Sequence, residues 1–318
     1  MKPKPQPPTP GAKSNSARTM LLGNACIFVA ILLFAANIPV VKILIPQWMD
    51  SVDVTLVRLG GGCVLFWLAS LFVRKDPIER TDFLKIFLGG GVSLFLFIYL
   101  LNVALKYGNP IDISIIMTLP PLYVILYEII FKHRKPSLLE VVGMLIAFGG
   151  AVIVIASGHQ SKHAPNPVLG DIFGIVCGVA YMAYLLILEK PTHKYRPIPM
   201  LKWVFLGACI PCVALCWGVV KAPILHTPAG FMPWLWVVFL AFGPSFLAYL
   251  LVNPAIKMIG SELVAIYQYF MPVATTIIAV LLGQAEFRWI EGIAIVVIIA
   301  GMFLTDYATH RKAKSAAK

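Results

Sequence analysis

Two prolines, Pro121 and Pro272, stand in the middle of long apolar stretches. Proline has no N–H and its ring clashes with the carbonyl four residues earlier. Inside a helix, these prolines would free the carbonyls of Met117 and Gln268. Backbone polar groups at membrane depth are tolerated where protein or a watery cavity meets them. We expect either a central substrate site beside two kinked helices or kinks that serve helix packing alone.

Three charged side chains, Lys42, Arg58 and Glu128, fall within the same apolar stretches. A charge at the centre of a membrane helix costs about 2.5–3.5 kcal/mol on insertion scales. We expect Lys42 and Arg58 close to the outer interface, where they could snorkel, bind substrate or act in gating. Glu128 could carry a coupling proton, or it could pair with basic residues near the inner surface.

Polar, aromatic and thioether side chains near the level of the prolines are candidates for substrate binding, with helix packing as the alternative for each tyrosine. These candidates are Asn37, Tyr99, Met117, Thr118, Tyr123, Tyr181, Tyr184, Tyr249, Tyr267, Gln268 and Thr275. Pro39 is expected to kink its helix as Pro121 and Pro272 do. Aromatic walls with a few hydrogen-bonding groups suit amino acids or mixed organic solutes.

No metal site, cofactor or catalytic residue is expected. Cys209, Cys212 and Cys216 share a helix face, but no histidine or carboxylate converges on them in the sequence. Small polarizable residues at a helix contact account for them. The sequence contains no HExxH or GxSxG motif and no cysteine beside a histidine, which argues against an intramembrane enzyme.

The elements that must position these residues are membrane helices. Of the 318 residues, 59% are hydrophobic and 13% are charged. About 20 apolar residues cross a hydrocarbon core of about 30 Å as a helix. Ten such stretches follow one another, from Met20–Ile45 to Trp289–Tyr307. An all-α integral membrane protein with ten transmembrane helices is therefore expected.

The formal charge of +12 is explained by topology. Of the 26 Lys and Arg residues, 20 lie in the two tails and the loops on the same side of the membrane as those tails. Positive residues favour the cytoplasmic side of short loops. Both termini are therefore expected in the cytoplasm, the protein in the cytoplasmic membrane, and the basic balance does not indicate nucleic acid. The expected partners are the lipid bilayer and a small-molecule substrate, and the sequence does not decide between a monomer and a homodimer.

A duplication organises the chain. Asn102–Pro121 and Asn253–Pro272 match at an offset that also pairs Glu140 with Glu291 and Gly150 with Gly301. The expected parts are a disordered cytoplasmic tail (1–19), a first five-helix repeat (20–157), an external linker (158–167), a second five-helix repeat (168–308) and a basic cytoplasmic tail (309–318). Because five is odd, the second repeat is expected to be inverted. Inverted repeats are typical of secondary transporters, which bind substrate near the midplane.

Several segments resemble the EamA family of the drug/metabolite transporter superfamily. They are Phe34–Lys42, Asn102–Tyr107, Gly170–Asp171 and Leu281–Glu286. Two positions depart from the family pattern: Phe34 stands where a tryptophan is expected, and Lys135 stands where a glutamate equivalent to Glu286 is expected. The resemblance implies a ten-helix carrier, commonly an exporter of amino acids or other small metabolites.

The predicted function is a secondary transporter that moves a small organic metabolite outward by alternating access. The alternative within transport is an anionic or phosphorylated metabolite. Lys106 and Lys257 lie at helix ends. They fit that alternative because the phosphate translocators of the superfamily use basic residues for anionic substrates, or they complement the helix dipoles. An intramembrane enzyme and a passive channel are the other classes. Cargo, direction and coupling ion are not determined by the sequence.

Overall fold

The computed structural model describes residues 10–45, 47–74, 76–133, 135–157, 164–216, 218–226, 228, 230–259, 264, 267–286 and 288–316. These residues form helices joined by short turns, and no strand occurs among them. The first half contains α1 (Pro10–Leu44), α2 (Ser51–Ser70), α3 (Arg80–Leu84), η1 (Lys85–Gly90), α4 (Gly91–Tyr107), α5 (Pro110–Ile116), α6 (Pro120–Phe131) and α7 (Leu138–Ser157). The second half contains α8 (Pro167–Lys194), α9 (Pro197–Cys216), η3 (Pro223–Leu225), α10 (Phe231–Phe242), η4 (Gly243–Leu247), α11 (Ala248–Ile259), α13 (Met271–Leu281) and α14 (Trp289–Ala316).

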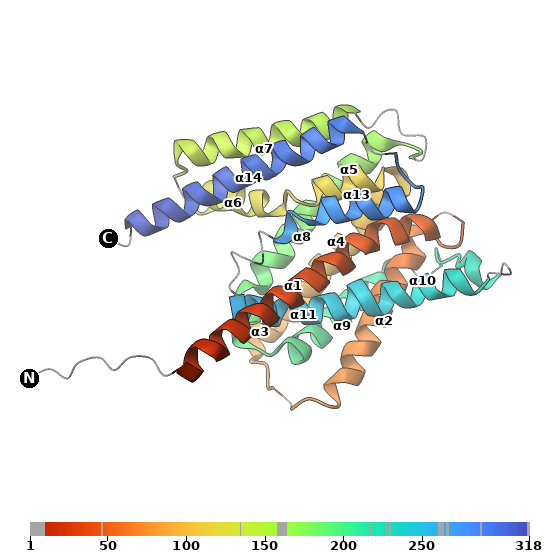
Figure 1. Ribbon diagram of the computed structural model, residues 1–318. Coiled ribbons are helices and arrows are strands. Elements are labelled where there is room, and N and C mark those ends of the chain that lie inside the picture. Colours follow the sequence, from red (N-terminus) through yellow and green to blue (C-terminus); the bar gives the residue numbers. More distant parts are fainter. Residues whose placement is uncertain are drawn as a thin grey trace, which may run out of the picture.

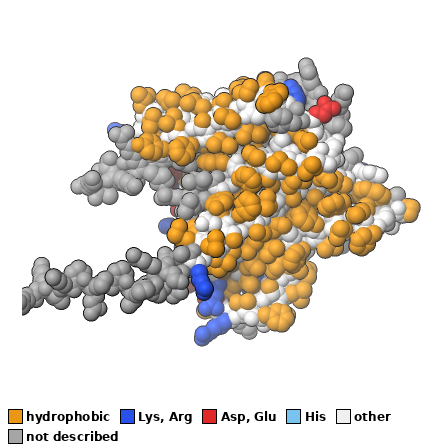
Figure 2. Space-filling model, viewed as in Figure 1, with side chains coloured by type: hydrophobic (Ala, Val, Ile, Leu, Met, Phe, Trp, Pro, Cys, Tyr) orange, Lys and Arg blue, Asp and Glu red, His pale blue; other side chains and the backbone are white. Residues whose placement is uncertain are grey.

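Helix length and surface both identify a membrane protein. Six helical stretches are long and apolar enough to cross a bilayer, and four shorter apolar helices accompany them. Large hydrophobic side chains such as Leu68, Leu145 and Val296 are exposed on the outside of the helices. Figure 2 shows such side chains over most of one face, with charged side chains at its margins. A surface of this kind is stable against lipid, so the chain is a multi-pass membrane protein.

The helix boundaries differ from the expected ones at both ends of the chain. α1 begins at Pro10, where a disordered tail to residue 19 was expected, and α14 continues to Ala316, where a tail from residue 309 was expected. Both ends of the described chain lie on the same side of the molecule (Figure 1). Most of the expected external linker, residues 158–163, lies outside the described residues.

The helix expected from Pro110 to Phe131 is broken into two. α5 ends with Met117 as its C-cap, and α6 starts at Pro120 with Pro121 in its first turn. In the second half, α13 starts at Met271 with Pro272 in its first turn. A proline at the start of a helix removes no intrahelical hydrogen bond, because that N–H has no partner there in any case. The expected mid-helix kinks at Pro121 and Pro272 are therefore wrong: each proline begins a helix.

The duplication is visible in the pairing of α7 with α14, which lie side by side and run in opposite directions (Figure 1). Glu140 accepts a hydrogen bond from the N–H of Ser137 at 2.6 Å, and Glu291 accepts one from the N–H of Arg288 at 3.3 Å. A Cβ on Gly143 would lie 2.7 Å from the Gly301 carbonyl oxygen, and a Cβ on Gly301 would lie 2.7 Å from that of Gly143. Equivalent glutamates therefore cap equivalent helices, and the two helices approach through glycine.

Candidate substrate cavity

A cavity of about 500 Å³ lies between helices from both halves of the chain. Its walls come from both halves of the chain: α1, α2, α4, the C-cap of α5 and α6 from the first half, and α8, α9, α11, the residues before α13 and the start of α13 from the second. At its deep end Asn37 and Arg58 are 2% and 1% exposed, whereas Glu189 and His193, which also line it, are exposed. The cavity therefore opens where α6 and α8 end, on the side from which α1 starts.

Six of the eleven substrate candidates line this cavity. They are Asn37, Met117, Tyr181, Tyr184, Tyr249 and Gln268. Arg58 and Glu128, expected in gating or coupling, line it as well. The other candidates, Tyr99, Thr118, Tyr123, Tyr267, Thr275 and Lys42, are not among its described lining residues.

Aromatic rings from both halves of the chain meet in the cavity wall. The rings of Phe97 and Tyr181 lie 4.6 Å apart, and those of Tyr181 and Tyr184 are stacked at 5.9 Å. Tyr184 meets Tyr249 edge-on at 6.2 Å, and Tyr249 meets Phe34 edge-on at 5.4 Å. These contacts fix the rings relative to one another, and they form a rigid apolar wall with hydroxyl groups along it.

Arg58 lies at the deep end of the cavity, and its expected position near the outer interface is wrong. The reason is local: Asp50 and Asp53 form a capping box that starts α2 at Ser51, which places Arg58 two turns inside the helix. The Arg58 Nε–H donates to the Ser245 hydroxyl at 3.4 Å. Within the described part of the chain, its Nη1 has no hydrogen-bond partner.

Asn37, on α1, also has an unsatisfied group at the deep end. Its Oδ1 is buried and has no hydrogen-bond partner among the described residues. The neighbouring Pro39 lies inside α1, and the carbonyl that it frees, that of Ala35, accepts a hydrogen bond from the Thr275 hydroxyl at 3.3 Å. Thr275 thus satisfies the carbonyl that Pro39 frees within α1, and it is not among the described residues that line the cavity.

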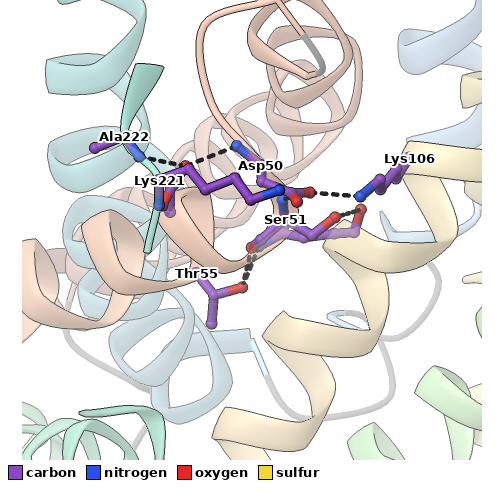
Figure 3. A network of polar contacts seen from close by, with 8 residues as sticks. Asp50, Ser51, Thr55, Lys106, Lys221 and Ala222 are labelled. Atoms are coloured by element: carbon purple, nitrogen blue, oxygen red, sulfur yellow. Dashed lines mark hydrogen bonds and ion pairs between the residues drawn. The ribbon is translucent and has the colours of Figure 1, made fainter. Parts of the chain in front are cut away.

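Beyond the deep end, the helices are joined by a polar network that we call the sealed end (Figure 3). It consists of Lys42, Asp50, Ser51, Asp53, Thr55, Asn102, Lys106, Lys221 and Ala222. Lys106 pairs with Asp50 at 2.8 Å, the Ser51 hydroxyl donates to the Asn102 carbonyl at 3.2 Å, and the Asn102 amide donates to Thr55 at 2.9 Å. The Asp53 carboxylate accepts from the N–H groups of Lys221 and Ala222 at 3.2 and 3.1 Å.

Lys42 joins α1 to the end of α4 at the sealed end. Its ammonium group donates to the carbonyls of Leu105 and Gly108, each at 2.9 Å. A snorkelling position for Lys42 is therefore wrong, because its charge binds protein carbonyls. Lys106 and Lys257 also have protein partners: Lys106 has Asp50, and Lys257 donates to the Tyr195 carbonyl at 3.3 Å.

The remaining candidates make contacts that hold helices together. The Thr118 hydroxyl donates to Ile115, and Tyr267 donates to Asn24 at 3.2 Å. Tyr99 stacks on Phe95 at 5.8 Å. Tyr123 is buried, in the same apolar cluster as Cys177. Glu128 pairs with Lys132 at 3.2 Å, one turn further along the chain, which is the ion pair expected as the alternative to proton transfer.

The sequence interpretation missed several residues of the structure. Asn253, Phe34 and Phe97 line the cavity but were not among the candidates for substrate binding. Away from the cavity, Asp112 and Asp171 are 1% and 0% exposed, and their carboxylate oxygens have no hydrogen-bond partners in the described structure. Asp112 could have been found from the sequence, because it is a charged residue inside an apolar stretch and burying a charge there is costly.

Comparisons with known proteins agree on the class of this protein. Relatives named as uncharacterized transporters occur in Archaeoglobus fulgidus (26% identity, 78% of this chain and 83% of the relative) and Bacillus subtilis (YyaM, 27%, 77% and 81%). A relative from Ancylobacter novellus, named aromatic amino acid exporter YddG, is 26% identical over 70% of this chain and 75% of its own. A solved crystal structure shares the fold with a TM-score of 0.60 at 21% identity, over 91% of this chain and 98% of that one. The model of the EamA-like transporter family matches residues 21–156 and again 168–306, so the chain belongs to this family.

Proposed function

We propose that this protein is a secondary transporter that exports a small organic metabolite, an amino acid or a related solute, by alternating access. The observation that carries the proposal is the shape of the pathway. A central cavity between the two halves of the chain is open on one side and closed on the other by the sealed end. A carrier with one binding site and two alternating exits requires this arrangement.

The proposed membrane topology is ten transmembrane helices in two inverted repeats of five. Both termini lie in the cytoplasm, because the basic residues gather in the tails and in loops on their side. The cavity then faces the cytoplasm and the sealed end faces outward. Reporter fusions in the segment 158–167 test this topology, and a cytoplasmic signal there would contradict both the topology and the inversion.

An anionic metabolite is the second candidate for the cargo. It is favoured by Arg58, whose guanidinium lies at the deep end of the cavity and whose Nη1 has no hydrogen-bond partner in the part of the chain that the structure describes. The relative named as an aromatic amino acid exporter supports the first candidate instead.

Transport is tested in two steps. Metabolite profiling of cells with and without the protein identifies solutes that accumulate in its absence. Each solute is then loaded into proteoliposomes, and its efflux is compared with efflux from liposomes without protein. Transport is contradicted if no solute differs in the cells and none leaves the proteoliposomes faster.

A further inference from the structure

We propose that Lys42 and Glu189 are equivalent gate residues of opposite charge: Lys42 holds the sealed end closed, and Glu189 opposes closure of the cavity mouth. The protein therefore rests with the cavity mouth open. The role of both residues depends on the alternating access proposed above, and together they set its balance.

The pairs α1–α11 and α8–α4 are built alike. A Cβ on Gly23 of α1 would lie 2.6 Å from the side chain of Ile259, the last residue of α11. A Cβ on Gly170 of α8 would collide with the backbone of Gly108, the C-cap of α4. Gly23 matches Gly170 at one spacing of the repeat, and Gly108 matches Ile259 at the spacing of the duplicated segments. Equivalent helices therefore meet at equivalent residues.

Lys42 and Glu189 occupy equivalent positions toward the ends of α1 and α8, because they match at the same spacing as the two glycines of those helices. The Lys42 ammonium group donates to the carbonyls of Leu105 and Gly108 at 2.9 Å each. The end of α1 is thus closed onto the end of α4.

The equivalent contact is open at the cavity mouth. Leu105 and Gly108 match Ile256 and Ile259, at the end of α11. Ile256 and Glu189 both line the cavity, and Glu189 is exposed. The cavity therefore lies between the ends of α8 and α11, whereas the ends of α1 and α4 are joined.

The duplicated asparagines show the same difference. Asn102, on α4, donates to the Thr55 hydroxyl of α2 at 2.9 Å. Asn253, on α11, lines the cavity and donates to the Tyr249 carbonyl of its own helix at 3.5 Å. One helix arrangement is thus closed at the sealed end and open at the mouth. Alternating access between two such repeats exchanges these two forms.

The opposite charges of Lys42 and Glu189 give this asymmetry a physical cause. The last carbonyls of a helix lack intrahelical partners and carry the negative end of the helix dipole, which stabilises a cation and repels an anion. Lys42 therefore favours closure of α1 onto α4. An ionised carboxylate accepts hydrogen bonds only. Closure of α8 onto α11 would therefore bring Glu189 to carbonyls that it cannot bind.

The lysines at the ends of α4 and α11 have other partners. Lys257 donates to the carbonyl of Tyr195, beside the turn from α8 to α9, at 3.3 Å. Its counterpart Lys106 pairs with Asp50, beside the turn from α1 to α2, at 2.8 Å. Each lysine thus ties a helix end to a turn of its own half of the chain. Closure of the mouth on the pattern of the sealed end would leave Lys257 bound to that turn.

Labelling at the sealed end tests Glu189 from the opposite end of the pathway. The full chain, with its native cysteines replaced by alanine and Ser51→Cys introduced, is placed in lipid nanodiscs, and its rate of reaction with N-ethylmaleimide is measured. Glu189→Gln should raise this rate roughly two- to fivefold and Glu189→Lys roughly tenfold, because each favours closure of the mouth and with it opening of the sealed end. Lys190→Gln is the matched control, because Lys190 is the exposed neighbour of Glu189 and is not among the described lining residues. Its rate should be unchanged.

The sign of the effect of Glu189→Lys decides the inference. A slower reaction of Ser51→Cys would show that Glu189 is attracted to Lys257 when the mouth closes. An unchanged rate would show that Glu189 does not affect the balance between the two states. Either result would overturn the proposed gate.

Lys42 is tested in combination with Glu189. Lys42→Gln should raise the Ser51→Cys rate at least roughly tenfold, because charge-assisted hydrogen bonds are lost. Its effect should add to that of the distant Glu189→Lys. In the double variant both states should then be similarly populated, so that Thr192→Cys in the cavity wall reacts roughly twofold more slowly. An unchanged Thr192→Cys rate would show local loosening at the sealed end and contradict coupled gates.

Failure of the gate assignment is distinct from failure of the transport function. If a solute leaves the proteoliposomes but Glu189→Lys changes neither labelling rate, the gate assignment is wrong and transport stands. If the labelling rates change as expected but no solute moves, the two states exist and the transport function fails.

Discussion

The sealed end and the deep end of the cavity are both polar, but they differ in how their polar groups are satisfied. At the sealed end, Lys42, Asp53 and Lys106 have protein partners at 2.8–3.2 Å. At the deep end, Arg58 Nη1 and Asn37 Oδ1 have none within the described chain. Buried polar groups are nearly always hydrogen-bonded. The sealed end thus joins helices through paired groups, although the Asn102 Oδ1 there also lacks a partner among the described residues, whereas the deep end leaves a guanidinium nitrogen and an amide oxygen without a partner in the cavity wall.

The close approach of Gly108 and Gly170, beside the sealed end, should be the point most sensitive to substitution. A Cβ on Gly170 would collide with the backbone N and Cα of Gly108, whose carbonyl binds Lys42. We expect Gly170→Ala to destabilise the protein by roughly 3 kcal/mol, the upper part of the range for overpacking. Thermal unfolding followed by fluorescence size-exclusion chromatography measures the loss. Gly149→Ala is the control, because nothing lies within 4 Å of its added Cβ. An unchanged stability for Gly170→Ala would show that the contact between Gly108 and Gly170 does not stabilise the protein.

Chemical labelling should distinguish the two ends of the pathway directly. The six native cysteines are replaced by alanine, and a single cysteine is introduced as Thr192→Cys in the cavity wall or Ser51→Cys at the sealed end. We expect N-ethylmaleimide to react with Ser51→Cys roughly a hundredfold more slowly, because a minor open state is populated at about 0.1–10%. Mass spectrometry of timed samples measures the rates. Equal rates would show that the reagent reaches both ends, which would contradict closure at the sealed end.

The Thr275 hydroxyl should stabilise the protein only while Pro39 is present. Thr275→Val would leave the buried Ala35 carbonyl without its donor, at a cost of about 1–3 kcal/mol. In a Pro39→Ala background the helix can supply its own N–H to that carbonyl, so the same change should cost less. A double-mutant cycle on thermal unfolding measures this coupling. Additive effects would show that the Thr275 hydroxyl does not compensate for the hydrogen bond that Pro39 removes.

The ion pair between Asp50 and Lys106 should have the smallest effect. Its side chains are 29% and 33% exposed, and pairs of this kind contribute roughly 0.2–1 kcal/mol. Lys106→Gln should therefore raise labelling of Ser51→Cys by less than about tenfold, which corresponds to 1.4 kcal/mol. A rise of a hundredfold or more would make this pair the main lock of the sealed end.

The pH dependence of the same pair follows from Asp50. Burial raises the pKa of Asp50, but hydrogen bonds from Lys106 and the Ser51 N–H outweigh it and lower the pKa below the usual value. A lowered folded pKa means that the stabilisation is complete above the ordinary aspartate pKa, about 3.9, and is lost as the pH falls below it. Labelling of Ser51→Cys corrected for the intrinsic maleimide rate should then be equal at pH 6 and pH 8. A change between these values that Asp50→Asn abolishes would contradict this.

Local composition was enough to predict the membrane environment and the duplication. Length, hydropathy and the repeated segment are properties of the chain itself, and Glu140 and Glu291 cap equivalent helices as the repeat predicts. Asn37, Tyr184 and Gln268 were found among the cavity residues because polar groups in apolar stretches are few.

Tertiary packing decided which of those polar groups meet a cavity and which meet a neighbour. Tyr184 lines the cavity and Tyr123 is not among its described lining residues, although both are tyrosines within apolar helices. The direction of a side chain depends on how its helix is rotated against the others, and that rotation is set by contacts between residues far apart in the chain. The sequence therefore determined that this is a duplicated membrane protein with scarce buried polar groups. Only the tertiary structure decided that the Arg58 Nη1 lies in the cavity without a partner among the described residues while Lys42 is bound at the sealed end.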